Sequence, residues 1–426
     1  MAYEAAQLPR DYRWNFTALL VNDICAAVAL TFINVSSVLP AFVGQLTTSA
    51  LTIGLVGTVF RAGLLLPQIV VARMMADRPY KKPFLLAGTV GKVFLGFIIL
   101  SLWAGLTNHP TPMLILFFTC LGLSTMGDGI TNVARYDVLA RAIPLRRRGR
   151  LIGFSQFISG ISGIGIGVFV GWSLRTLGFP QNYALLFSMA GVAYIPAIAG
   201  LIAIREPAPQ AINPDIQADL QDRAGWLKLL IHDKTFVRFM VCRVLLGTMD
   251  LAVPFYVGHA EKVLQLPTSI IGTFVIAQAV AGALSGIALG FMCERRGPRR
   301  VIQTTALVTM VGPVFALAAH LIRSPFLILG YPIVFVILGF ANSSWMIGCY
   351  NYIVEIAPEG MRPLYLGVGN TILGAMVVVP MIGGWILERT SFTVLFSTTA
   401  AMVAISFIVS LSLTRSPSET TVECAV

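Results

Sequence analysis

Long apolar segments alternate with short polar ones along almost the whole chain. Windows of about 19 residues with high mean hydropathy mark membrane-spanning helices, each of which needs about 20 apolar residues. Twelve such segments lie near residues 17–43, 51–72, 84–106, 112–134, 151–174, 183–204, 236–258, 269–292, 301–322, 326–349, 363–387 and 393–414. The pattern therefore predicts an all-α membrane protein with twelve spans and short loops.

One long polar stretch interrupts this pattern, at residues 205–234. It contains EPAPQAINPDIQADLQDR, a run rich in Pro, Asp and Gln that is typical of a linker. We therefore expect three parts: an N-terminal six-helix bundle over residues 1–204, a cytoplasmic linker over 205–235, and a C-terminal six-helix bundle over 236–426.

The composition supports a membrane protein. Of the 426 residues, 56% are apolar and 12% are charged, whereas soluble domains are about 25% charged. The Phe, Leu, Ile and Gly content also argues against a β-barrel, whose spans alternate apolar and polar residues. The six cysteines show no CxxC spacing, and without a His/Cys cluster we expect no metal site.

The net charge of +11 is distributed unevenly over the predicted loops. Counted by side, 23 Lys and Arg residues fall on the side that holds both termini, and 4 fall on the other. Positive residues concentrate in cytoplasmic loops. We therefore expect a multi-pass protein of the inner or plasma membrane with both termini in the cytoplasm, and no nucleic-acid partner.

An internal repeat relates the two halves. PAFVG at residues 40–44 matches PFYVG at 254–258, and YDVLARAIPLRRRGRLIG at 136–153 matches YNYIVEIAPEGMRPLYLG at 350–367. Both pairs are separated by 214 residues, about half of the chain. Because six spans are an even number, the two halves have the same orientation, which indicates a parallel repeat about an axis along the membrane normal.

The loops after spans two and eight carry a further motif. Residues 290–299 read GFMCERRGPR, and residues 73–82 read RMMADRPYKK, which keeps the Ala-Asp-Arg core but lacks both glycines of G-x-L-A-D-R-x-G-R-K. With the 6+6 plan and the central linker, the chain resembles the major facilitator superfamily (MFS). The resemblance implies the MFS fold, with two pseudo-symmetric six-helix bundles around a central cavity.

In that family the acid of this loop motif is read as part of a cytoplasmic gate. By resemblance, Asp77 would bridge to span eleven and Glu294 to span five. The implied gate residues are Asp77, Arg78, Lys81, Arg148, Glu294, Arg295 and Arg299. The alternative is that the basic residues only set the topology, which explains the Arg and Lys residues but not an acid at the same place in both halves.

Ionisable side chains inside spans cost about 2.5–3.5 kcal/mol each on insertion scales, so they are expected to face a cavity or a partner. The repeat places polar residues at equivalent depths, pairing Arg61 with Gln278, Asp128 with Asn342, and Gln156 with Asn370. The candidate substrate or ion ligands are Asp23, Arg61, Asp128, Gln156, Asp250, Gln278, Asn342, Trp345 and Asn370.

Other interpretations of these residues stay open. Arg61 and Asp128 could form a structural ion pair instead of a binding site. Lys92 and Arg243 lie within reach of the cytoplasmic interface, so we expect them to extend toward it or to join the gate. Arg243 also lies seven residues before Asp250, on the same helical face.

No HExxH, GxSxG or P-loop motif is present, so we expect no enzyme and no cofactor. A gradient must then supply the energy, and a proton is the expected coupling ion. The sparse polar residues in mostly apolar spans favour a secondary active exporter of small amphipathic molecules, drug- or lipid-like. VPMIGG at 379–384 resembles the Gly-Pro-x-x-Gly-Gly motif of antiporters.

Two alternatives remain: an uptake symporter for a small metabolite, and a non-transporting receptor or assembly factor of the same fold. For each we expect a monomer in a lipid bilayer.

Overall fold

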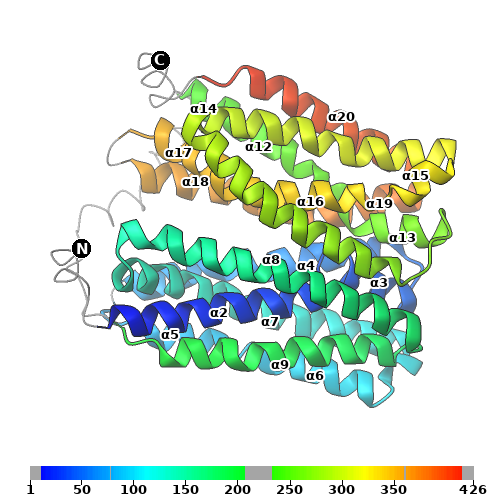
Figure 1. The fold of residues 1–426 in the computed structure, drawn as a ribbon, viewed down its shortest axis with the longest axis horizontal. Coiled ribbons are helices and arrows are strands. Elements are labelled where there is room, and N and C mark those ends of the chain that lie inside the picture. The colour runs from blue at the N-terminus through cyan, green and yellow to red at the C-terminus, as the bar shows by residue number, and fades with distance from the viewer. Residues whose placement is uncertain (1–10, 77, 207–232, 359–360, 415–426) are drawn as a thin grey trace. The chain divides into compact units, whose positions relative to one another are not determined.

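The computed structural model describes residues 11–76, 78–206, 233–358 and 361–414. These residues form helices and loops, and no strand occurs among them. By their internal contacts they divide into two compact units (Figure 1). The first unit is Met1–Thr48, Val56–Ala211 and Thr268–Ile276, and the second is Ser49–Leu55, Ile212–Pro267 and Ala277–Val426. The boundaries expected at residues 204 and 236 stay predictions.

The first unit is built mainly from eight α-helices and one 3-10 turn. They are α2 (Tyr12–Phe32), α3 (Val38–Leu46), α4 (Ala50–Ala76), α5 (Lys82–Thr89), α6 (Lys92–Trp103), η1 (Leu106–Asn108), α7 (Pro110–Ala142), α8 (Leu145–Thr176) and α9 (Gln181–Ala203). Helix α2 packs along α9 and α8, and α5 packs along α7. These contacts bring the first, third, fourth and sixth predicted spans together.

The second unit contains more interrupted helices. They are α12 (Lys234–Gly247), η2 (Thr248–Leu251), η3 (Val253–Phe255), α13 (Tyr256–Lys262), α14 (Ile270–Ile322), α15 (Pro325–Leu329), α16 (Ile333–Ser344), the π-helical η4 (Trp345–Tyr350), α17 (Asn351–Ile356), α18 (Arg362–Ala375), η5 (Met376–Val378), α19 (Val379–Arg389) and α20 (Phe392–Leu411). Of α14, this unit contains all but the first seven residues. Helix α12 packs against α20, and η2 packs against α19 and α20.

Ten helical segments in the described part of the chain are long and apolar enough to cross a membrane. One of them, α14, contains two predicted spans separated by a sharp bend at Gly297, whose φ of 75° lies in the left-handed region that favours glycine. The seventh predicted span is divided into α12, η2, η3 and α13, so it is not among the ten. The all-α membrane architecture is confirmed.

Several predicted spans are wrong in detail. The first, expected as one helix over 17–43, ends at Phe32 and restarts at Val38. Between them the Asn34 side chain accepts a hydrogen bond from the Ser36 amide at 2.9 Å, a local turn that competes with the helix. The fourth span extends to Ala142 instead of 134, and the tenth extends through a π-helical turn to Ile356 instead of 349.

A candidate binding cavity in the first unit

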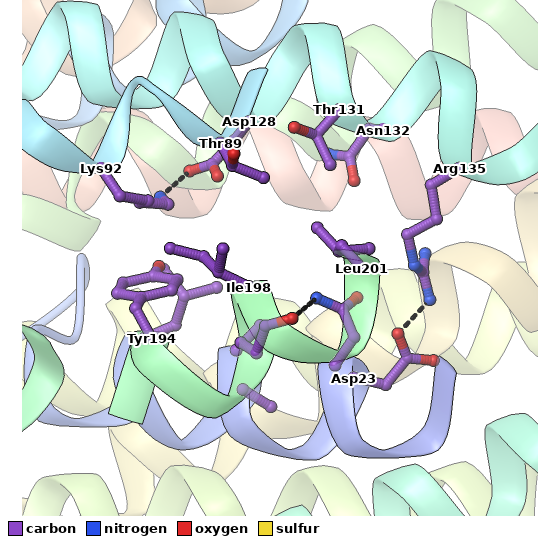
Figure 2. Close-up of a pocket in the computed structure, with 15 residues that line it drawn as sticks. Asp23, Thr89, Lys92, Asp128, Thr131, Asn132, Arg135, Tyr194, Ile198 and Leu201 are labelled. Carbon is purple, nitrogen blue, oxygen red and sulfur yellow. Dashed lines mark hydrogen bonds and ion pairs between the residues drawn. The ribbon is translucent and has the colours of Figure 1, made fainter. Parts of the chain in front are cut away.

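A cavity of about 260 Å³ lies inside the first unit, between α2, α5, α6, α7 and α9 (Figure 2). Nine of its fifteen lining residues are charged or polar, and six are apolar. The lining residues are Asn22, Asp23, Ala26, Ala27, Leu30, Thr89, Lys92, Asp128, Thr131, Asn132, Arg135, Tyr194, Ala197, Ile198 and Leu201. In small-molecule sites, polar groups fix the orientation of a ligand and apolar side chains pack against the rest of it.

One end of the cavity holds an ion pair between the third and fourth spans (Figure 2). The Lys92 ammonium donates a hydrogen bond to Asp128 Oδ2 at 2.7 Å, and both side chains are mostly buried. The same ammonium lies 4.1 Å from the centre of the Tyr194 ring, which adds a cation–π contact from α9. Asp128 is close to the middle of the 33-residue helix α7, so its carboxylate lies far from either end of that helix.

Close helix packing places Lys92 opposite Asp128. Three glycines, Gly88, Gly91 and Gly127, let α5 and the start of α6 approach α7 closely. A Cβ atom added at Gly127 would lie 2.4 Å from the Gly88 carbonyl oxygen and 2.9 Å from Gly91 Cα. Any larger residue would separate these helices, so the glycines set the distance across which the ion pair forms.

A second ion pair lies at the other end of the cavity (Figure 2). An Arg135 Nη atom donates to Asp23 Oδ1, joining α7 to α2. Arg135 follows Asp128 by seven residues, which is about two helical turns, so both point from the same face of α7. The cavity therefore carries two carboxylates and two cations, and its formal charge is balanced.

The gap between α2 and α9 is closed by backbone contact and one buried amide. Asn22 Nδ2 donates to the Ala197 carbonyl at 3.0 Å. A Cβ at Gly200 would lie 2.7 Å from the Ala18 carbonyl oxygen, so these helices also pack closely. This leaves Thr89, Thr131, Asn132 and Tyr194 as polar side chains that an occupant could contact.

The structure brings only some of the sequence-predicted ligands together. Asp23 and Asp128 line the cavity, whereas Arg61 on α4 and Gln156 on α8 belong to the same unit but do not line it. The hypothesis of an Arg61–Asp128 ion pair is wrong, because the Asp128 carboxylate pairs with Lys92.

The remaining predicted ligands belong to the second unit. Asp250 is buried in η2, Gln278 lies half-buried on α14, and Asn342 and Asn370 are exposed on α16 and α18. Trp345 begins the π-helical turn η4, one turn after Asn342. The role of these residues as substrate ligands stays a prediction.

For two basic residues the expected position is wrong. Lys92 does not extend to the membrane interface but pairs with Asp128 inside the cavity. Arg243 is 5% exposed, and its guanidinium stacks on Trp345. The sequence did contain a sign of these buried positions. Both residues lie about two helical turns inside predicted spans, and a charged side chain at that depth needs a buried partner.

The expected gate residues mostly contact nearby carbonyls. Lys81 donates to the carbonyls of Met75 and Arg78 after the end of α4, and Arg148 donates to those of Ile143 and Ala140. Cationic side chains commonly satisfy the last carbonyls of a helix in this way. Arg299 similarly contacts the Leu411 carbonyl.

For the other expected gate residues, the structure gives the exposure of the side chains and, among the described residues, no gate contact. Arg78, Glu294 and Arg295 are exposed, and Asp77 lies outside the described residues. The cytoplasmic gate therefore stays a prediction.

Glu206 falls in the expected linker, and its sequence context gave no sign of a structural role. Its carboxylate accepts hydrogen bonds from the Lys81 and Lys82 amides at 2.7 and 2.9 Å and from Arg141 at 2.7 Å. It thereby joins the start of α5 to the end of α7. The side-chain amide of Asn15 holds the backbone of neighbouring Arg205. It donates to the Arg205 carbonyl and accepts from the Arg205 amide, both at 2.8 Å. The first two residues of the expected linker therefore pack against the first unit.

Gly127→Ala tests the packing that positions the ion pair. We expect it to lower the free energy of unfolding by about 1–3 kcal/mol, because the added methyl group meets backbone atoms that cannot move away. Thermal unfolding of the purified protein measures this. Gly96→Ala on α6 is the matched control, since a Cβ there has no neighbour within 4 Å. Equal midpoints for the two variants would contradict the role assigned to Gly127.

Among the described residues, no group of three or more His, Cys, Asp or Glu side chains is placed to hold a metal ion. The polar groups of the cavity wall are two carboxylates, two cations, two amides, two hydroxyls and one phenol. A buried carboxylate paired with a cation can exchange its pairing for a proton, and an apolar wall can hold an organic molecule beside it.

Known proteins of similar sequence are multidrug resistance proteins by name. The chain is 23% identical over 443 aligned positions to the multidrug resistance protein MdtG of Citrobacter koseri, covering 97% of this chain and 98% of that one. It is 24% identical over 349 positions to MdtG of Enterobacter lignolyticus, covering 77% and 74%.

Solved structures share the fold at low identity. A bacterial homologue of the iron transporter ferroportin, in its inward-facing state, superposes with a TM-score of 0.71 at 13% identity, covering 94% of this chain and 98% of that one. A D-xylose–proton symporter superposes with a TM-score of 0.67 at 16% identity, covering 94% and 96%.

The family model of the Major Facilitator Superfamily matches residues 24–376 and 248–423. These matches include both halves that the internal repeat relates, and nearly all candidate ligands lie within them. With the multi-pass helical fold and the cavity between its spans, they show that the chain belongs to the Major Facilitator Superfamily of membrane transporters.

Proposed function

We propose that this transporter is a proton-coupled exporter of small amphipathic compounds in the inner membrane. The observation that carries the proposal is the Lys92–Asp128 ion pair in the wall of a 260 Å³ cavity inside the first unit. The names of the MdtG relatives, which are multidrug resistance proteins, support drug-like compounds as the substrate class.

The ion pair offers a site for the coupling proton. With Asp128 ionised, the cavity holds two balanced acid–base pairs. A proton on Asp128 removes one negative charge and weakens the contact with Lys92, whose ammonium then lacks its counter-charge. Because both side chains of this ion pair are mostly buried, the electrostatics of the cavity differ strongly between these two states. A change of this kind is what links proton binding to the affinity for an occupant.

The cavity wall also suits an amphipathic occupant. Ala26, Ala27, Leu30, Ile198 and Leu201 supply apolar surface, and the Tyr194 ring lies beside the Lys92 ammonium. A compound with one polar group could contact the ion pairs while its apolar part lies against α2 and α9. All six apolar residues of the wall lie on α2 and α9. This one-sided apolar surface favours an amphipathic compound over a sugar, which needs hydrogen bonds on all sides.

Purified protein in proteoliposomes tests the proposal. A pH gradient is imposed in either direction, and a panel of positively charged, negatively charged and neutral fluorescent amphipathic compounds is followed together with an internal pH dye. We expect a subset to move against its own gradient, with proton movement in the opposite direction, and a protonophore to stop it.

The other results of this experiment have distinct meanings. Movement of compound and protons in the same direction would identify a symporter. Transport at the same rate with and without a pH gradient would overturn proton coupling. No transport of any compound in the panel would overturn the amphipathic substrate class.

A further inference from the structure

Arg243 is a buried cation without a carboxylate partner in the described part of the chain. It lies on α12 and is 5% exposed. No ion pair is formed by its guanidinium with any described residue, and its Nε atom is buried without a hydrogen-bond partner there. Its close partner is Trp345, whose ring centre lies 3.6 Å from the guanidinium carbon. The stacked ring offsets part of the cost of burial but supplies no negative charge.

Three other basic side chains that are mostly buried do have carboxylate partners. Lys92, Arg135 and Arg141 are mostly buried in the first unit, and each contacts a carboxylate, from Asp128, Asp23 and Glu206 respectively. Burying a cation alone is costly, so the uncompensated charge at Arg243 calls for a specific explanation. An anion supplied from outside the protein would complete the site.

The internal repeat places Trp345 at a position equivalent to the wall of the first unit's cavity. A shift of 214 relates Asp128, Thr131 and Arg135, which line the first unit's cavity, to Asn342, Trp345 and Cys349. The acid at 128 is therefore replaced by an amide and the cation at 135 by a thiol, while a new cation appears on α12. At these positions the second unit therefore lacks the acid and the cation of the first cavity, and a cation on α12 lies against Trp345 instead.

The Trp345 side chain lies at the surface of the second unit. Trp345 is 44% exposed, and its ring covers the buried guanidinium. Asn342, one turn earlier, is also exposed and carries an amide that can donate hydrogen bonds. An indole ring provides a flat apolar surface, and a guanidinium binds carboxylate, phosphate or sulfonate oxygens through paired N–H donors.

We propose that Arg243 and Trp345 form a binding site for an amphipathic anion. The guanidinium binds the anionic headgroup, with Asn342 as an additional donor, and the Trp345 ring packs against the adjoining apolar part. Two sources supply this chemistry: a transported organic anion or an anionic phospholipid. As a substrate site it rests on the proposed transport function, but the binding itself does not.

Three probes with one apolar body test the charge preference: naphthalene-2-carboxylate, naphthalene-2-methanol and 2-naphthylmethylammonium. Their binding to the purified full-length protein in neutral detergent is measured by equilibrium dialysis. We expect the carboxylate to bind at least about tenfold more tightly than the alcohol, because a charge-assisted pair replaces a neutral contact. Equal affinity for all three probes would overturn the proposal.

Variants separate this site from general charge effects. Arg243→Gln should remove the tenfold preference, and Arg243→Lys should keep part of it. Trp345→Ala should weaken the carboxylate and the alcohol alike, since both lose the ring. Arg389→Gln, which removes an exposed cation of the same unit, is the matched control and should leave the preference unchanged. A preference that survives in Arg243→Gln would overturn the assignment.

Thermal stability adds a readout that distinguishes binding from a structural role. If Arg243 is held for an external anion, Arg243→Gln should unfold at the same or a higher temperature in the absence of ligand, because an uncompensated buried charge is removed. Naphthalene-2-carboxylate should raise the midpoint of the wild type but not that of the variant. A large fall in the ligand-free midpoint of Arg243→Gln would mean a structural role and would overturn the proposal.

Nanodiscs with and without phosphatidylglycerol distinguish the two sources. A fall in apparent affinity for naphthalene-2-carboxylate when the lipid is added, absent in Arg243→Gln, assigns the site to a lipid headgroup. An unchanged affinity assigns it to soluble anions. Either result keeps the site, whereas failure of the transport assay with an intact charge preference would remove only the proposed function.

Discussion

Asp128→Asn should abolish transport driven by a pH gradient while the protein stays folded and inserted in the membrane. The amide has nearly the shape of the carboxylate and can still accept a hydrogen bond from Lys92, which donates at 2.7 Å in the wild type. It cannot bind or release a proton in the working range. If Asp128 carries the coupling proton, proton movement down the gradient can no longer drive movement of the substrate in this variant.

Proteoliposomes with an imposed pH gradient measure this loss, and downhill movement of the same compound measures what remains. Asp137→Asn is the matched control, because Asp137 lies on the same helix but does not line the cavity. Its gradient-driven rate should stay within about twofold of the wild type. A wild-type rate in Asp128→Asn would remove Asp128 from the coupling role.

A double variant separates two effects of Asp128→Asn: the loss of stability from the unpaired Lys92 ammonium and the loss of transport from the missing carboxylate. Asp128→Asn leaves a mostly buried ammonium without its counter-charge, at a cost of up to about 3–5 kcal/mol, reduced by the partial exposure of this site. Adding Lys92→Met should restore the thermal stability that the single variant loses, but not the transport. Recovery of transport in the double variant would show that the proton binds elsewhere.

Glu206→Ala should strongly destabilise the first unit, although it removes only one side chain at the edge of the helices. The Glu206 side chain is only 5% exposed, and it receives the Lys81 and Lys82 amides as well as Arg141. Its removal leaves these donors unsatisfied at the start of α5, where the helix itself offers no acceptors. We expect a loss of about 3–5 kcal/mol, the usual result of breaking a buried ion pair.

Thermal unfolding should show this as a fall of at least about 5 °C in the midpoint. Asp137→Ala is the matched control because Asp137 pairs with the same Arg141, one helical turn away, but its side chain is 42% exposed. Such pairs contribute about 0.3–0.5 kcal/mol, so its midpoint should hardly change. Similar falls in both variants would contradict the role assigned to Glu206.

The fold was largely predictable because insertion into a membrane depends on local hydropathy. All twelve predicted spans are helical over most of their length, and the repeat and the loop motifs indicated the family that the comparisons confirm. The errors lie at interruptions, such as the turn after Phe32 and the break after Gly247. A hydropathy window averages over these few residues and therefore cannot detect them.

The site was predictable only in part. The sequence identified Asp23 and Asp128 as unusual, because a carboxylate inside a span is costly wherever its partner lies. It did not identify their partners. Arg135 follows Asp23 by 112 residues and Asp128 follows Lys92 by 36. Pairing across such separations depends on which helices touch and on their rotation, and the repeat contains no information about either.

The sequence by itself thus determined that this chain crosses the membrane many times, that its halves are related, and that a few ionisable residues lie inside its spans. These properties follow from the composition of each segment and need no contact between segments. Only the tertiary structure decided that Lys92 meets Asp128, that Glu206 joins α5 to α7, and that Arg243 lies beneath Trp345. Each of these depends on close contacts, such as Gly88 against Gly127, that set the distance between helices to within an ångström.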